Sequence, residues 1–437
     1  MRVTLADPSA LIPDFERVHR EQRALYPYRP AGWQPVHTVY VPADRFGAGT
    51  VRAWGQAALE LFRRHLPQGE LAAILGPVVD PVLDAAIGPV PGGAAGPSAG
   101  DLAGEVHARV AAKLGREPVE DLRVDFEDGY GVRPGEEDGH VSAAAGAIAA
   151  MDADGTLPRR WGLRVKSFAD GDPVRSLRTL DGLLTGVMER AGHLPKGFTV
   201  TFPKVLMRAY LHQFADCLGA LEDGLGLDRG RLRFEIQVEA PQTVRFLDAG
   251  LVTALDGRLA AAHFGVFDYT ASCGLPPHEQ RLDHPACDHA RHVMQTVFAG
   301  TGVELSDGSL AATPASDDGP AVRGLWRRHA RLVGHSLAHG FPQGWDMHPS
   351  HLVSRYAAVY AFHLSRHGEY ARRVRAWQER RDAGGGVMDE PATITTMIAA
   401  LRRADLVLGD VRPSGPGAGG TDPGAGGTDP GAGGTEG

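Results

Sequence analysis

Short apolar runs alternate with helix-length amphipathic segments along most of the chain. The first run, 36–41, is rich in β-branched and aromatic residues and leads through a Pro-containing turn into 51–65, which has helical periodicity. Further runs predict strands at 122–126, 161–165, 198–202, 233–238 and 260–266. Because so many strand–helix repeats favour a closed parallel barrel over an open sheet, we predict an α/β fold, a (β/α)8 TIM barrel.

Breaks in this pattern suggest the domain boundaries. A Gly/Ala/Pro-rich stretch at 88–100 predicts an insertion after the first βα unit, at about 70–118. We expect an N-terminal extension (1–35), the barrel (36–350), a C-terminal helical lid (351–408) and a tail (409–437). The lid helices are predicted at 352–367, 371–381 and 392–404. The tail repeats Gly-Ala-Gly-Gly-Thr-Asp-Pro and has nothing to fill a core, which predicts disorder.

Composition narrows the classes of partner. The 437 residues include 45 Lys and Arg against 53 Asp and Glu, a net charge of −8 without a basic run, so we expect a small-molecule substrate and neither nucleic acid nor membrane. Three cysteines without C-x-x-C spacing fit a reducing compartment. With no signal-peptide pattern and no apolar run of transmembrane length, we expect a cytoplasmic protein.

Charged side chains follow the predicted strands at their carboxyl ends, where barrel active sites lie. The second strand leads into Asp125, Glu127 and Asp128, which alone would fit a solvated acidic turn equally well. Arg164 and Lys166 end the next strand and by alternation share a face. A guanidinium there can bind a substrate carboxylate or an oxyanion, and it can also pair with Glu127 or Asp128.

The next three predicted strands add a lysine and two carboxylates to this end. A structural salt bridge is the preferred interpretation of Lys204. Glu239 and Asp268 follow consecutive strands, and Mg²⁺ is typically held by one or two protein carboxylates together with water and substrate oxygens. Gly265, shortly before Asp268, would allow backbone or ligand to approach closely.

Eight motifs in order, over about 36–405, resemble those of the HpcH/HpaI aldolase and citrate lyase β-subunit-like superfamily, which includes malyl-CoA lyase. They are HTVYVPADRF, VDFEDGYG, LRVK, TFPKV, IQVEAPQTV, HFGVFDYTASCG, GWDMHPSH and GGGVMDEPA. The resemblance implies a phosphoenolpyruvate/pyruvate-type barrel. It further implies a Mg²⁺-dependent carbon–carbon bond lyase or aldolase that acts through an enolate on a 2-oxo or 2-hydroxy acid, free or as its CoA thioester.

Carried over by motif, the resemblance gives each site residue an expected role. Glu239 and Asp268 would bind Mg²⁺, or Mn²⁺ in its place, and Arg164 would contact the carboxylate and oxygen of a 2-oxo acid. Glu127 and Asp128 would support the metal's water shell and the arginine.

The resemblance also extends to the lid and to the substrate side of the site. Lys204 and Gly265 would line the substrate. Asp389 matches a lid aspartate that, in the malyl- and citramalyl-CoA members, reaches a neighbouring subunit's site as an acid/base group. This implies a homo-oligomer, commonly a trimer or hexamer.

Several departures from the family pattern leave alternatives open. The insertion before Glu127 is unusually long, Lys166 stands for the usual Asn, and Ala240 stands for the usual Thr. Phe-Asp-Tyr at 267–269 is similar to the Trp-Asp-Tyr of malate synthases, so glyoxylate condensation is one alternative. Another is a class I aldolase with a Schiff base on Lys166 or Lys204. A third is a non-catalytic barrel that binds an acyl-CoA or oxo acid.

Overall fold

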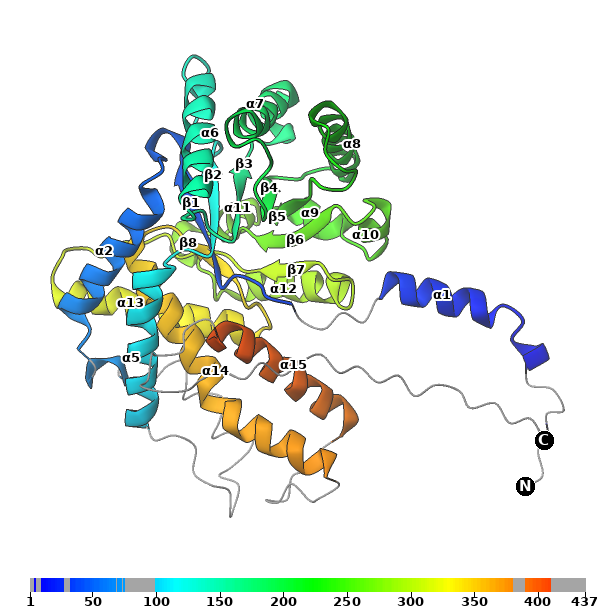
Figure 1. The fold of residues 1–437 in the computed structure, drawn as a ribbon. Helices are drawn as coiled ribbons and strands as arrows, with labels where there is room; N and C mark the ends of the chain where they lie inside the picture. Colours follow the sequence, from blue (N-terminus) through cyan, green and yellow to red (C-terminus); the bar gives the residue numbers. More distant parts are fainter. Residues whose placement is uncertain are drawn as a thin grey trace, which may run out of the picture.

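A parallel barrel forms the body of the protein (Figure 1). The structure, a computed structural model, describes residues 4, 9–26, 32–67, 69–72, 74, 99–379 and 390–409. Its strands are β1 (His37–Pro42), β2 (Asp121–Asp125), β3 (Arg160–Arg164), β4 (Phe198–Phe202), β5 (Phe234–Val238), β6 (Leu259–Phe264), β7 (Glu304–Ser306) and β8 (Gly344–Asp346). Among these residues the sheet has 8 parallel strands in the order β7-β6-β5-β4-β3-β2-β1-β8. A parallel bridge between Ser306 and Gln343 joins its two ends, which confirms the predicted (β/α)8 barrel.

Helices surround the barrel and fill the connections between its strands (Figure 1). They are α2 (Thr50–His65), α5 (Ala99–Arg116), α6 (Glu137–Ala153), α7 (Pro173–Ala191), α8 (Arg208–Leu225), α9 (Pro241–Phe246), α10 (Gly250–Ala254), α11 (Val266–Ser272), α12 (Pro285–Phe298), α13 (Gly319–Ala338) and α14 (Pro349–Gln378). Outside this ring lie α1 (Phe15–Leu25) and α15 (Pro391–Leu408). Single 3₁₀ turns occur at η1 (Ser9–Leu11), η2 (Ala43–Arg45), η3 (Phe168–Asp170) and η4 (Pro277–Glu279).

Local sequence signals fix several helix ends. Asp172 and Asp318 precede α7 and α13, and each carboxylate accepts a hydrogen bond from the backbone N–H three residues on. Gly192 and Gly226 follow α7 and α8 with φ of 79° and 66°, a left-handed conformation that costs glycine little. Asp172 and Asp318 thus mark the starts of α7 and α13, and Gly192 and Gly226 mark the ends of α7 and α8.

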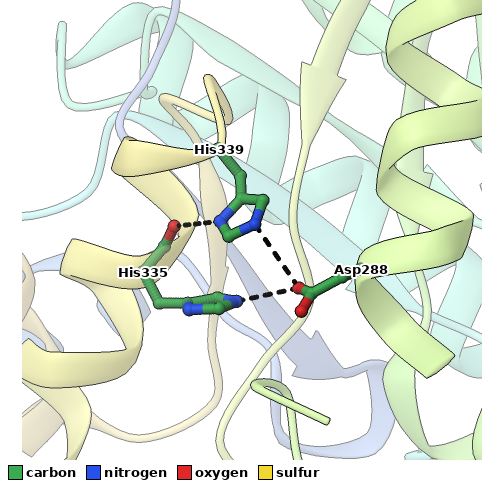
Figure 2. A group of neighbouring side chains, drawn as sticks. All are labelled: Asp288, His335 and His339. Carbon is green, nitrogen blue, oxygen red and sulfur yellow. Dashed lines mark hydrogen bonds and ion pairs between the residues drawn. The ribbon is translucent and has the colours of Figure 1, made fainter. Parts of the chain in front are cut away.

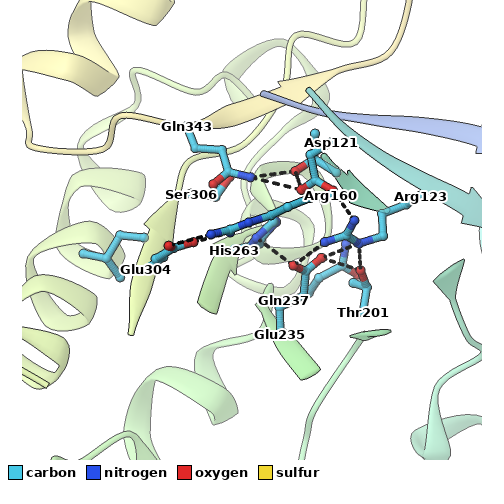
Figure 3. A network of polar contacts seen from close by, with 12 residues as sticks. Asp121, Arg123, Arg160, Thr201, Glu235, Gln237, His263, Glu304, Ser306 and Gln343 are labelled. Atoms are coloured by element: carbon cyan, nitrogen blue, oxygen red, sulfur yellow. Dashed lines mark hydrogen bonds and ion pairs between the residues drawn. The ribbon is translucent and has the colours of Figure 1, made fainter. Parts of the chain in front are cut away.

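The barrel interior is polar (Figure 3). In β2, Asp121, Arg123 and Asp125 alternate with Leu122 and Val124, and all five are buried. The polar residues of β2 contact side chains of other strands, so the apolar ones face the helices.

Arg123 is the centre of an interior network of hydrogen bonds and ion pairs (Figure 3). Its Nη2 donates to Glu235 Oε2 at 2.7 Å and its Nε to Thr201 Oγ1 at 3.1 Å, while Asp121 pairs with it from the same strand. Arg160 and Glu304 form a further ion pair. Charged side chains thus take the place that branched apolar residues usually occupy in such barrels.

The segment predicted as an insertion, 70–118, contains α5 within its described part. Val106, Val110 and Leu114 of this helix are buried in the main core, and α5 packs against α2 and α14. The helix therefore belongs to the outer layer of the barrel.

The predicted lid begins inside α14. Residues 350–361 of this helix are buried and α14 contacts α13, α2 and α5, so its first half serves as the eighth barrel helix. The helix predicted at 352–367 and the described part of the one predicted at 371–381 belong to one continuous helix, which ends at Gln378, and α15 packs along it. In the part of the chain that is described, no helix has the length and hydropathy needed to span a membrane.

Candidate active site

Arg164 lies at the carboxyl end of β3, opposite Asp125 in the β2–β3 register. Its Nε and Nη2 donate to the two oxygens of Asp125 at 2.7 and 2.8 Å, and its Nη1 lies 3.1 Å from Glu127 Oε2. The guanidinium also lies over the Tyr40 ring, 5.0 Å from its centroid. A bidentate pair of this kind fixes the direction of the remaining donors of Arg164.

Asp125, to which the sequence analysis gave no role, shapes the loop after β2. Its Oδ1 accepts the N–H of Glu127 at 3.0 Å and its Oδ2 the N–H of Gly129 at 2.9 Å. A Cβ on Gly129 would lie 2.5 Å from Asp125 Oδ2, so glycine is needed for this close approach. Asp125 thus positions both Arg164 and the acidic loop.

Lys204 makes the ion pair that was predicted for it. Its Nζ pairs with Glu127 and lies 2.6 Å from Asp128 Oδ1. Although burial works against its charge, Glu127 and Asp128 raise the pKa of Lys204, so the amine is held as an ammonium. Its backbone has φ of 47°, unusual for a residue other than glycine, and the N–H donates to Glu239 Oε1 at 2.7 Å. One strained residue therefore connects three carboxylates.

Lys166 lies apart from this cluster. Strand β3 ends at Arg164, so the alternation that would place Lys166 on the same face does not continue. The expected ion pair with Glu127 is made by Arg164, and Lys166 pairs with Glu137. Its Nζ donates to the carbonyls of Phe126 at 2.5 Å and Gly131 at 3.0 Å and lies 3.5 Å from Glu137 on α6. These contacts tie the loop after β2 to the barrel.

Glu239 and Asp268 follow β5 and β6, as the strand pattern predicted. Glu239 is only 2% exposed, and burial followed by the charges of Glu127 and Asp268 raises its pKa to about 8. Burial also raises the pKa of Asp268, against the opposing charge of Lys204. Burial is the main cause of both shifts, and neighbouring carboxylates add to it, so a bound cation would favour the ionised form of both groups.

Gly265 provides the space for the Glu239 carboxylate. A Cβ there would lie 2.5 Å from Glu239 Cβ and 2.6 Å from Glu239 Oε2, whereas the backbone itself, at φ −103°, is open to any residue. The expectation for this glycine was a close approach of backbone or ligand, whereas the structure shows a close approach of the Glu239 side chain. An all-oxygen donor set with excess negative charge fits a hard divalent cation such as Mg²⁺.

Glu127 and Asp128 have pKa values shifted in opposite directions. Burial raises the pKa of Glu127 to about 7, even though Arg164 and Lys204 act against it. For Asp128 the effect of burial is outweighed by its hydrogen bond to Lys204, and the pKa is lowered. Two neighbouring carboxyl groups with separated pKa values can perform different proton-transfer roles.

Tyr40, Gln237 and Trp345 were missed by the sequence analysis. Gln237 Nε2 lies 3.5 Å from the Tyr40 hydroxyl, and the Tyr40 and Trp345 rings are 4.9 Å apart. Among the described residues, Gln237 Oε1 and Trp345 Nε1 are buried without a hydrogen-bond partner. Such polar atoms are costly unless a ligand or water satisfies them. The alternation of Gln237 between Glu235 and Glu239 was the signal that could have found it.

Asp389 lies outside the described residues, which resume at Glu390 ahead of α15. The role of Asp389 in the lid therefore stays a prediction. The homo-oligomer and the cytoplasmic location also stay predictions.

Comparison with known proteins gives one family model and several similar folds. Residues 15–410 match the model described as Domain of unknown function (DUF6986). No curated protein matches the chain significantly. A citrate lyase from Burkholderia xenovorans LB400 has a similar fold, with a TM-score of 0.51 and 19% identity over 70% of this chain and 89% of that one.

Structures of Haloferax volcanii malate synthase are also similar. One crystallised with glyoxylate gives a TM-score of 0.48 at 13% identity, over 85% of this chain and 96% of that one. A magnesium/glyoxylate complex of the same enzyme gives a TM-score of 0.46 at 14% identity, over 84% of this chain and 97% of that one. At such identities the citrate lyase likeness speaks for the fold alone.

Proposed function

We propose that this chain, which belongs to the DUF6986 family, is a Mg²⁺-dependent carbon–carbon bond lyase or aldolase. Its substrate would be a 2-oxo or 2-hydroxy acid, free or as the CoA thioester, and the reaction would pass through an enolate. The observation that carries this proposal is the meeting of a carboxylate cluster and a buried guanidinium at one end of the barrel. The citrate lyase with a similar fold shares the barrel on which this cluster is built.

Glu239 and Asp268 are the residues that would hold Mg²⁺, which when bound supplies a Lewis acid next to the substrate oxygens. Arg164 would bind the substrate carboxylate and stabilise the oxyanion as it develops, because Asp125 fixes its orientation in advance. Lys204 would hold Glu127 and Asp128 in place and, with Gly265, line the substrate.

A base must remove or return one proton. Asp389 is the first candidate, through the family resemblance. Among the described residues Glu127 is the alternative, since a carboxyl group whose pKa is about 7 can exchange a proton near neutral pH.

The competing mechanism, a Schiff-base aldolase, has less support in the geometry. Such an enzyme needs a lysine with a lowered pKa. Lys166 donates to two carbonyls, and the pKa of Lys204 is raised. Glyoxylate condensation of the malate synthase type would use the same carboxylates and differs in substrate.

A substrate screen with and without metal tests the proposal. The purified protein with Mg²⁺ would be assayed against pyruvate, oxaloacetate, glyoxylate and their CoA-thioester aldols. EDTA should abolish turnover, Mg²⁺ or Mn²⁺ should restore it, and Glu239→Gln or Asp268→Asn should lower it by about 10²-fold or more. Asp138→Asn, which removes an exposed carboxylate paired with Arg178, is the matched control and should leave turnover unchanged. Full activity after chelation, together with borohydride trapping of a lysine, would refute the metal mechanism.

A further inference from the structure

A second group of possible metal ligands lies in the outer helical layer, between α12 and α13 (Figure 2). It consists of Asp288 on α12 and of His335 and His339, one turn apart at the end of α13. His335 Nε2 lies 2.9 Å and His339 Nε2 3.7 Å from Asp288 Oδ1. Each side chain is 25% exposed, so the group is accessible to an ion and to water.

The spacing of these atoms suits a tetrahedral ion. With bonds of about 2.0–2.1 Å to nitrogen or oxygen, neighbouring ligands of tetrahedral zinc lie roughly 3.3 Å apart. The two separations from Asp288, 2.9 and 3.7 Å, lie on either side of this value. Small side-chain rotations would equalise them.

Surrounding hydrogen bonds hold the ligands in a competent form. His339 Nδ1 lies 2.9 Å from the carbonyl oxygen of His335, and a proton on Nδ1 leaves the Nε2 lone pair free. Arg291 Nη1 donates to the same oxygen, Asp288 Oδ1, at 2.6 Å and is itself fixed by Asp307, so the carboxylate is held with this oxygen toward the two imidazoles. Hydrogen bonds to the far side of ligands are typical of metal sites.

The other grouping of histidines and an aspartate lacks these properties. His329, Asp346 and His351 are all buried, and Asp346 is already paired with Arg355 and His37. His351 Nε2 is engaged with the Ala312 carbonyl oxygen at 2.8 Å. This second set is a satisfied core network.

We infer that Asp288, His335 and His339 form a Zn²⁺ site, with water as the fourth ligand. Two imidazoles and one carboxylate favour Zn²⁺ over Mg²⁺, which prefers oxygen donors. The bound ion would clamp α12 to α13, and because it binds the folded chain, it would stabilise the fold by mass action. The site is separate from the carboxylates at the end of the barrel, so it does not depend on the function proposed above.

Metal titration of the full-length protein tests the site. Protein stripped with chelator would be titrated with Zn²⁺ by calorimetry in excess Mg²⁺, and with Co²⁺ by visible absorption. We expect one Zn²⁺ per chain, the intense absorption of tetrahedral Co²⁺, and a higher melting temperature with Zn²⁺. His335→Ala and His339→Ala should weaken binding by about 100-fold or more. His289→Ala, at an exposed position of α12 next to Asp288, is the matched control and should bind as the wild type does.

Two results would overturn the assignment. One is the absence of tetrahedral Co²⁺ absorption in the wild-type protein, a test that does not depend on the folding of any variant. The other is unchanged Zn²⁺ affinity in folded His339→Ala, as judged by circular dichroism. Glu239→Gln should keep full Zn²⁺ binding, and its loss there would place the ion at the barrel end.

Discussion

Gly265→Ala adds one methyl group at the most crowded point of the candidate active site. The new Cβ would lie 2.5 Å from Glu239 Cβ, whereas carbon atoms prefer about 3.5–4.0 Å, so the carboxylate must move by roughly 1 Å. The backbone conformation is allowed for alanine, so no strain is added there. Overpacking of this kind costs about 1–3 kcal/mol of unfolding free energy.

The functional loss should exceed the loss of stability. Metal ligands must stay within about 0.2 Å of their places, and a misplacement of about 1 Å can lower turnover by about 10²-fold. We therefore expect a folded Gly265→Ala protein that binds Mn²⁺ weakly, as measured by electron paramagnetic resonance, and that turns over slowly. Urea unfolding would measure the stability change.

Gly368→Ala is the matched control. This glycine is exposed in the middle of α14, and nothing lies within 4 Å of the added Cβ. The Gly368→Ala substitution should raise the free energy of unfolding by about 0.5–1 kcal/mol and leave Mn²⁺ binding normal. If Gly265→Ala bound Mn²⁺ with wild-type affinity, Glu239 would not be a metal ligand and the site would be wrong.

Three further predictions concern other parts of the chain. Asp389→Asn should keep the fold and Mg²⁺ affinity but lower turnover by about 10²-fold. Mixing Asp389→Asn subunits with Arg164→Ala subunits should partly restore activity. A fully active Asp389→Asn enzyme would remove this residue from the mechanism. Truncation after residue 412 should leave activity and melting temperature unchanged, and a large fall in either would place the domain end further on. Burial, then the Arg403 charge, lowers the pKa of His363 to about 4. The unfolded chain protonates His363 from about pH 6.5 downward, whereas the folded chain protonates it only near pH 4. The free energy of unfolding should therefore fall by about 3 kcal/mol as the pH is lowered across that window. His363→Gln should flatten this slope of melting temperature against pH, and an unchanged slope would contradict the lowered pKa.

Six strands could be predicted because each combines an apolar run with a polar or glycine end. Strands β7 and β8 span three residues each and are too short to show a period, so they were not predicted from the pattern. The helix boundary expected after residue 367 does not exist, because Gly368 is accommodated inside α14.

Within the candidate site, strand-end positions were predictable and side-chain partners were not. Glu239 and Asp268 follow their strands and Arg164 ends its strand, as expected. Lys166 goes elsewhere because the strand ends two residues earlier, and strand ends are uncertain from sequence alone. The role of Asp125 depends on the register between β2 and β3, which one sequence does not reveal.

The pair formed by Arg123 and Glu235 also bears on how the molecule folds. It joins residues 112 positions apart, from the first and the second half of the barrel. In a fragment that ends after β4, Arg123 would keep its ion pair with Asp121 but lose the one with Glu235. The complementary fragment would bury Glu235 without its guanidinium, which is costly. Neither half-barrel should therefore persist as an intermediate, and the two halves should desolvate their charges together. We expect one cooperative unfolding transition, with slow folding because the decisive contacts are distant in sequence.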